Sequence, residues 1–166
     1  LHPHLTRSAA QLRRFEREAE LGRKLTHPNL VPTIDSGYAG GIPWMAMELV
    51  RGPTLFELAV REGPLDETRV CRLLADVADA LADLHDHGII HRDVKPQNLV
   101  YDETIDRARL MDLGIARAEE FSTLTATGQF IGSTRYAAPE QFHPGSDPID
   151  GRADLYGLGV VLYELL

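Results

Sequence analysis

Residues 89–100 read IIHRDVKPQNLV, and residues 111–114 read MDLG. Both stretches set polar side chains beside short apolar runs, so they predict loops that carry functional groups between strands. Asp93 and Asn98 are five residues apart with Lys95 between them, and a loop that curls back aims all three at one phosphate group. Asp112 supplies a hard oxygen ligand of the kind that Mg²⁺ prefers. The two stretches therefore predict a site for phosphoryl transfer.

Length and composition indicate one globular domain. The chain has 166 residues, of which 43% are hydrophobic and 25% are charged, which is ordinary for a soluble protein with a core. Its formal charge of −8, from 25 acidic and 17 basic residues, argues against binding to nucleic acid or anionic lipid. Cys71 is the single cysteine, which excludes an intrachain disulfide and fits a reducing compartment. We expect its thiol to be buried or inert.

The sequence predicts a cytoplasmic protein with no membrane segment in this chain, although an anchor outside it stays open. No apolar run reaches about 18 residues, and the first 20 residues are too charged for a secretory signal.

Apolar spacing predicts both helices and strands. Helices are expected from Thr6 or Ser8 to about Lys24 and over residues 54–63, 66–88 and 155–166. Strands are expected over residues 30–34, 42–50, 88–90, 99–101 and 108–111, with a glycine-rich turn at 37–41. Asp76, Asp79 and Asp83 lie off the apolar stripe of the third helix, which predicts a solvated face. Residues 114–138 have no sustained periodicity and are expected to form a long surface loop.

Three motifs in order resemble those of the eukaryotic-type protein kinases. Residues 91–98, HRDVKPQN, are similar to the catalytic loop, residues 112–114 to the metal-binding motif, and Ala138-Pro139-Glu140 to the end of the activation segment. Three motifs in register are far more specific than one. Lys95 followed by Pro96 resembles the serine/threonine kinases, and residues 132–141 resemble bacterial members.

The resemblance implies an α+β, two-lobed kinase fold that this chain represents in truncated form. We expect a remnant of the N-lobe at 1–47, a hinge at 48–53 and the first part of the C-lobe at 54–166. The first N-lobe strands, with the glycine-rich loop and the phosphate-binding lysine, are missing from this chain, and so are the last C-lobe helices. We therefore expect the fragment alone to be inactive, whatever its parent does.

The resemblance also implies catalytic roles. Asp93 would accept or orient the proton of the incoming hydroxyl, and Lys95 would steady the transferring phosphoryl group. Asn98 and Asp112 would hold Mg²⁺. The substrate would be a protein with a serine or threonine acceptor.

Nucleotide binding and regulation are implied in the same way. Glu48 and Val50 would offer backbone groups to the adenine of ATP, and Glu18 would pair with the phosphate-binding lysine. Arg92 would pair with a phosphate on the activation loop. The candidate acceptors of that phosphate are Thr123, Thr125, Thr127 and Ser133, which could equally be unmodified loop.

Two other functions stay open. A pseudokinase would keep the fold as a nucleotide- or partner-binding module without turnover, but the presence of Asp93, Asn98 and Asp112 argues against it. A small-molecule phosphotransferase would share the Asp and Asn spacing, but such enzymes lack an activation segment ending in Ala-Pro-Glu. Residues 85–87, His-Asp-His, are interpreted as a solvated helix end and not a metal site, and His91 is expected to be structural.

Overall fold

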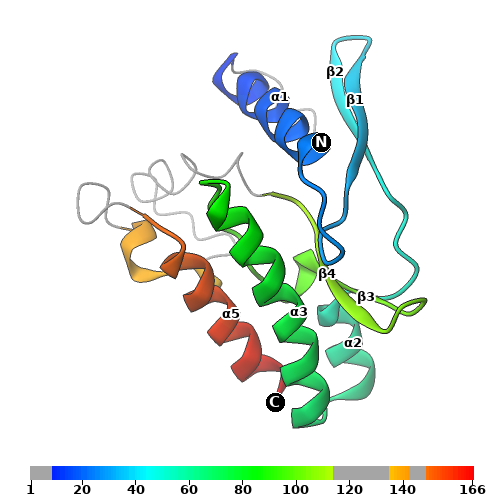
Figure 1. Ribbon diagram of the computed structural model, residues 1–166, viewed down its shortest axis with the longest axis vertical. Coiled ribbons are helices and arrows are strands. Elements are labelled where there is room, and N and C mark those ends of the chain that lie inside the picture. Colours follow the sequence, from blue (N-terminus) through cyan, green and yellow to red (C-terminus); the bar gives the residue numbers. More distant parts are fainter. Residues whose placement is uncertain (1–8, 114–134, 143–148) are drawn as a thin grey trace.

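A computed structural model describes residues 9–113, 135–142 and 149–166. The helices are α1 (Ala9–Lys24), α2 (Leu55–Glu62), α3 (Glu67–Asp86) and α5 (Arg152–Leu165), with short 3₁₀ helices η2 (Pro96–Asn98) and η5 (Pro139–Phe142). The strands are β1 (Thr33–Ala39), β2 (Ile42–Met47), β3 (Leu99–Asp102) and β4 (Arg107–Leu110). They form two separate antiparallel hairpins, β1–β2 and β3–β4. The architecture is α+β, with the β3–β4 hairpin lying between the helices α2, α3 and α5 and the α1 and β1–β2 portion (Figure 1).

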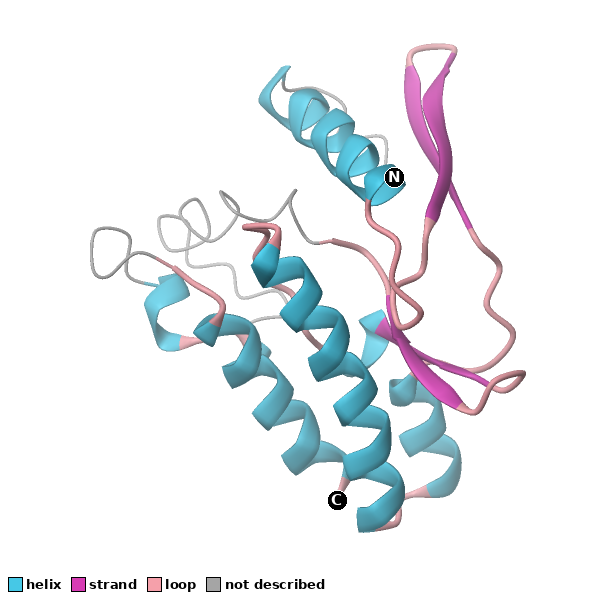
Figure 2. Cartoon of the chain, viewed as in Figure 1, coloured by secondary structure: helices cyan, strands magenta, loops and turns pink. Residues whose placement is uncertain are grey.

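Helix α3 forms the centre of the core and lies beside α5 (Figure 2). Its apolar stripe is buried, as the sequence predicts. Asp66 caps its start by accepting from the Arg69 amide at 3.1 Å, and Gly88 follows its end with φ of 71°. The prediction of a solvated acidic face is wrong for Asp76. Its carboxylate accepts from the Ala108 amide at 3.1 Å, which fastens β4 to α3.

The first hairpin differs from the prediction at both ends. The strand expected over residues 30–34 starts only at Thr33, because the preceding Pro32 has no N–H to donate to a ladder. Residues 37–39, expected in the turn, pair with β2, and the reversal uses Gly40 and Gly41 alone, with φ of 57° and 79°. The second strand ends at Met47 and not at residue 50.

The strand expected over residues 88–90 does not form. The Ile89 amide turns back to the Leu84 carbonyl at 2.9 Å, so this segment continues the end of α3. The strands expected over residues 99–101 and 108–111 do form, as β3 and β4.

Loops extend the β3–β4 hairpin on both edges. Along β4, the Leu110 amide donates to the Asn29 carbonyl at 2.7 Å. Along β3, the Tyr101 amide donates to the Pro53 carbonyl at 2.9 Å. Gly52 is required here, because a Cβ atom would lie 1.9 Å from the Tyr101 carbonyl oxygen. The hairpin therefore holds the segment before β1 and the segment before α2 in fixed places.

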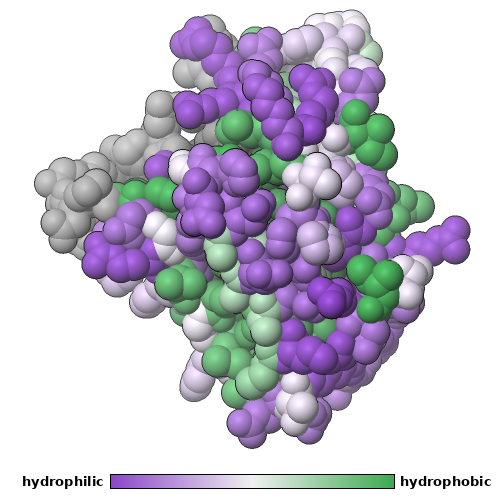
Figure 3. Space-filling view, viewed as in Figure 1, coloured by the Kyte–Doolittle hydropathy of each residue, from purple (hydrophilic) through white to green (hydrophobic). Residues whose placement is uncertain are grey.

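The chain around the core is mostly hydrophilic, with apolar residues gathered over α5 (Figure 3). Leu155, Tyr156 and Tyr163 of α5 are exposed. None of the helices in the described ranges is long and apolar enough to cross a membrane.

Candidate functional site

The loop before β3 brings together the three polar residues predicted to act on a phosphate group. The Lys95 ammonium donates to Asp93 Oδ2 at 2.8 Å, and Asn98 Nδ2 donates to the same oxygen at 2.9 Å. Asn98 Nδ2 also donates to the Asp93 carbonyl at 2.9 Å, so Asn98 keeps Oδ1 as its acceptor atom. The Asp93 side chain is only 9% exposed. The loop thus holds a carboxylate against a cation in a partly dehydrated place, where charge-assisted hydrogen bonds are strong.

His91 supports this loop from beneath, as expected for a structural histidine. It is fully buried, and burial lowers the pKa of its imidazole, which favours the neutral ring. Its Nδ1 accepts from the Asp93 amide at 3.3 Å. The proton then lies on Nε2, which donates to the Met111 carbonyl at 3.2 Å. His91 therefore connects the backbone of Asp93 with the backbone of Met111, the residue before Asp112.

Asp154, in the first turn of α5, fixes the same loop from the other side. Its Oδ1 accepts from the Arg92 amide at 2.7 Å, and its Oδ2 accepts from the His91 amide at 2.9 Å. His85 Nε2 lies 2.7 Å from Oδ2, so His85 is engaged and not part of a solvated helix end. Arg92 has φ of 65°, a strained conformation for a residue with a side chain. The hydrogen bond from the Arg92 amide to the Asp154 carboxylate stabilises this strained backbone conformation.

Residues 135–142 are anchored to both the loop and α5. Gln141 Nε2 donates to the Arg92 carbonyl at 3.2 Å, and Gln141 Oε1 accepts from the Ala138 amide at 2.8 Å. The Tyr136 hydroxyl donates to Glu164 on α5. Burial and this hydrogen bond raise the pKa of Tyr136 to about 12. The backbone of Arg92 is thus held by Asp154 through its amide and by Gln141 through its carbonyl.

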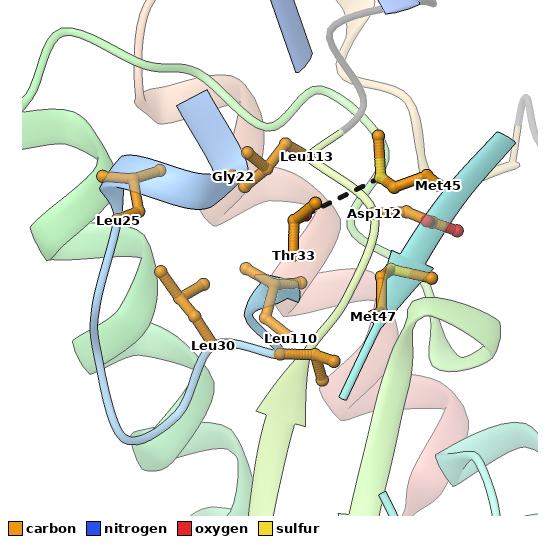
Figure 4. A pocket seen from close by; sticks show the side chains of 10 residues that line it. Gly22, Leu25, Leu30, Thr33, Met45, Met47, Leu110, Asp112 and Leu113 are labelled. Atoms are coloured by element: carbon orange, nitrogen blue, oxygen red, sulfur yellow. Dashed lines mark hydrogen bonds between the residues drawn. The ribbon is translucent and has the colours of Figure 1, made fainter. Parts of the chain in front are cut away.

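Asp112 lies two residues after the end of β4, on a segment that meets the loop. The Met111 amide donates to the Asn98 carbonyl at 2.9 Å, which brings Asp112 to the side of Asn98. Asp112 is exposed and has φ of 57°. It also lines a pocket between α1 and the β1–β2 hairpin, together with Gly22, Thr33, Met45 and Leu113 (Figure 4). Asp93, Lys95 and Asn98 are therefore in direct contact, and Asp112 lies on the segment that the Met111 backbone hydrogen bond joins to Asn98.

Glu48 and Val50 lie in the irregular segment between β2 and α2. The Glu48 amide donates to the Pro32 carbonyl at 3.1 Å. The Glu48 carboxylate accepts a hydrogen bond from Arg109 Nη1 at 2.6 Å, and this hydrogen bond lowers the pKa of Glu48. Arg109 also donates to the Leu30 carbonyl at 3.0 Å. The guanidinium thus joins β4 to the segments on either side of the β1–β2 hairpin.

Several predicted residues lie outside what the structure describes. Glu18 lies on α1, but its side chain is not among the side chains that the structure describes. The candidate phosphate acceptors Thr123, Thr125, Thr127 and Ser133 fall in residues 114–134, outside the described ranges.

Cys71 is exposed, so of the two alternatives expected for its thiol, buried or inert, the buried one is wrong. It neighbours Val70 on α3 but lies off the buried stripe. In the described ranges, no group of three His, Cys, Asp or Glu residues is placed to hold a metal ion.

Asp154, Gln141 and Arg109 were missed as site residues. A signal exists for two of them: Asp154 is an acid at the start of an apolar helix, and Arg109 stands inside an apolar run. Such charges are buried only when paired, but the sequence does not reveal their partners.

Comparisons with known proteins indicate the family of this chain. The family model described as "Protein kinase domain" matches residues 4–166. The serine/threonine-protein kinase PknB of Mycobacterium leprae is 41% identical over 100% of this chain, which spans 27% of the length of that relative. The solved kinase domain of PknI from Mycobacterium tuberculosis has a TM-score of 0.79 and 32% identity, covering 99% of this chain and 59% of the solved one. A structure of Rad53 in complex with AMP-PNP has a TM-score of 0.74 and 25% identity, and the match covers 92% of this chain and 37% of the solved one.

Proposed function

The chain belongs to the protein kinase domain family, and from this premise we propose that it is part of a serine/threonine protein kinase. The enzyme would transfer the γ-phosphate of ATP to serine or threonine hydroxyls of protein substrates. One observation carries the proposal: the Asp93 carboxylate is held by Lys95 at 2.8 Å and by Asn98 at 2.9 Å. This arrangement supplies a proton acceptor and a cation at one place, as phosphoryl transfer requires.

In this mechanism the acceptor hydroxyl oxygen bonds to the γ-phosphorus while the bond from that phosphorus to the bridging oxygen breaks and ADP leaves. Asp93 orients the hydroxyl and takes its proton. Lys95 stabilises the negative charge on the transferring group. His91 and Asp154 keep the loop in the conformation that presents these two side chains.

The residues present fit a magnesium ion. Asn98 Oδ1 and the exposed Asp112 carboxylate are hard oxygen donors on adjacent segments, and Mg²⁺ uses few protein ligands together with substrate phosphates. The bound ion would neutralise charge on the phosphates of ATP. Asn98 is suited to this role because its Nδ2 is already committed to Asp93.

The nucleotide would lie against the segment after β2. The Glu48 amide is used by Pro32, so the carbonyl of Glu48 and the backbone of Val50 would meet the adenine. In this proposal, residues 1–47 are the N-lobe part, residues 48–53 are the hinge and residues 54–166 are the C-lobe part. Glu18 of α1 would pair with a phosphate-binding lysine outside this chain.

The proposal includes regulation and location. Arg92 would bind a phosphate on Thr123, Thr125, Thr127 or Ser133, and its backbone is held firmly enough by Asp154 and Gln141 to serve as a fixed anchor. We place the activity in the cytoplasm, acting on proteins and not on nucleic acid, which suits the charge of −8.

A transfer assay tests the proposal with the full-length protein, labelled ATP, Mg²⁺ and a generic protein acceptor. Label should appear on serine or threonine, disappear with Asp93→Asn and disappear when EDTA removes the metal. Wild-type protein that binds ATP without transferring label would refute the proposal in favour of a pseudokinase. Transfer to a small molecule but not to protein would refute the substrate class.

A further inference from the structure

Gly22 of α1 lies unusually close to Thr33 at the start of β1. A Cβ atom on Gly22 would lie 2.4 Å from Thr33 Oγ1 and 3.1 Å from Thr33 Cβ. The backbone of Gly22 is helical, so its conformation does not require glycine. Glycine in a helix interior is less favourable than alanine. The close approach of α1 to β1 therefore accounts for the glycine.

Thr33 has little freedom to move aside. Its Oγ1 donates to Met45 Sδ at 3.7 Å (Figure 4), and its backbone pairs with Met47 across the hairpin. A Cβ atom on Gly22 would also lie 3.7 Å from Leu113 Cδ1, the residue after Asp112. Three segments thus meet at Gly22: α1, the β1–β2 hairpin and the stretch that carries Asp112.

We propose that Gly22 is a positioning residue, whose missing side chain lets Thr33 seat α1 against β1 and beside the Asp112-Leu113 segment. An added methyl group would push α1 away from Thr33 or turn Thr33 off Met45. Glu18 lies one turn before Gly22 on α1, so the same displacement would move it. The catalytic consequence rests on the proposed function, because it concerns Asp112 as a metal ligand and Glu18 as a partner of the phosphate-binding lysine.

The test uses the full-length protein with Gly22→Ala, Thr33→Ala, Gly22→Ala/Thr33→Ala and Gly22→Ala/Thr33→Val. Gly22→Ala should lower kcat/KM for phosphate transfer about tenfold or more, since small misplacements at a catalytic site are costly. Adding Thr33→Ala removes the obstructing Oγ1 and should return activity to the level of Thr33→Ala alone. Thr33→Val keeps the bulk and should not rescue. Gly159→Ala on α5, where a Cβ meets nothing within 4 Å, is the matched control and should keep full activity.

Thermal midpoints of unfolding give a second readout that does not depend on activity. Gly22→Ala should lower the midpoint, and Thr33→Ala should reverse that loss, so the two shifts should not add. Full activity of Gly22→Ala, or equal rescue by Thr33→Ala and Thr33→Val, would overturn the proposal. A wild-type protein without transfer would refute only the proposed function, and additive midpoint shifts would then refute the Gly22–Thr33 contact.

Discussion

Asp154 should be the most costly single side chain to remove from the described site. Its carboxylate is buried, with 1% of the residue exposed. It accepts from the Arg92 amide at 2.7 Å, from the His91 amide at 2.9 Å and from His85 Nε2 at 2.7 Å. Asp154→Ala removes all three hydrogen bonds and leaves two backbone amides buried without an acceptor. Asp154→Asn keeps one acceptor oxygen and turns a donor toward the remaining groups.

The expected loss follows from the hydrogen bonds. A hydrogen bond to a charged group contributes about 1.5–3 kcal/mol, and a buried donor left unsatisfied costs about 1–3 kcal/mol. These effects overlap, because removing the carboxylate also removes the cost of burying its charge. We expect Asp154→Ala to lower the free energy of unfolding by about 3–5 kcal/mol and Asp154→Asn by about 2 kcal/mol. The larger loss is a substantial part of the roughly 5–15 kcal/mol that stabilises a typical domain.

Urea unfolding of the full-length protein, followed by circular dichroism, measures the loss. Asp86→Asn is the control, because Asp86 is exposed at the end of α3 and should change the midpoint little. Activity of Asp154→Asn should also fall, since one of the two backbone amides at His91 and Arg92 loses its acceptor. A loss below about 1 kcal/mol for Asp154→Ala, the size of an ordinary neutral hydrogen bond, would refute the claim that this carboxylate holds the loop.

Three further results are expected. Burial lowers the pKa of His91 in the folded protein. Below pH 6.5, the ordinary value for histidine, the unfolded state therefore binds more protons at this residue than the folded state does. The free energy of unfolding should then fall as the pH drops below that value, by up to about 1.4 kcal/mol per pH unit for one proton. His91→Gln should flatten that slope, and an unchanged slope in urea titrations would contradict a neutral His91. Thr54→Ala breaks the capping box of α2 and should cost about 1 kcal/mol in thermal unfolding; no shift would show that the cap is dispensable. Cys71 is exposed, so a thiol reagent should label it in the folded protein; labelling only after denaturation would contradict the exposure.

Features that depend on neighbours in sequence were predictable. The buried stripe of α3, the capping box at Thr54 and the stop at Gly88 arise within one or two helical turns. The order of Asp93, Lys95 and Asn98 was equally local, and the resemblance to a family assigned their roles. The exposure of Cys71 is also a local feature, because helical spacing places it beside the buried stripe of α3.

Features that depend on distant partners were not predictable. Asp154 meets Arg92 across 62 positions, and Arg109 meets Glu48 across 61. Asp76 was placed on a solvated face because nothing in α3 shows that the Ala108 amide would reach it.

The β3–β4 hairpin explains how distant residues come together at one site. Asn98 precedes β3 and Asp112 follows β4, so antiparallel pairing of Leu99 with Leu110 brings both to the same end of the hairpin. The Met111 amide then closes onto the Asn98 carbonyl at 2.9 Å. Backbone hydrogen bonds therefore set the separation of the two proposed metal ligands. Substitution of the exposed Arg107 of β4, which preserves this pairing, should leave metal-dependent transfer intact, whereas a shift of register by one residue would separate the ligands.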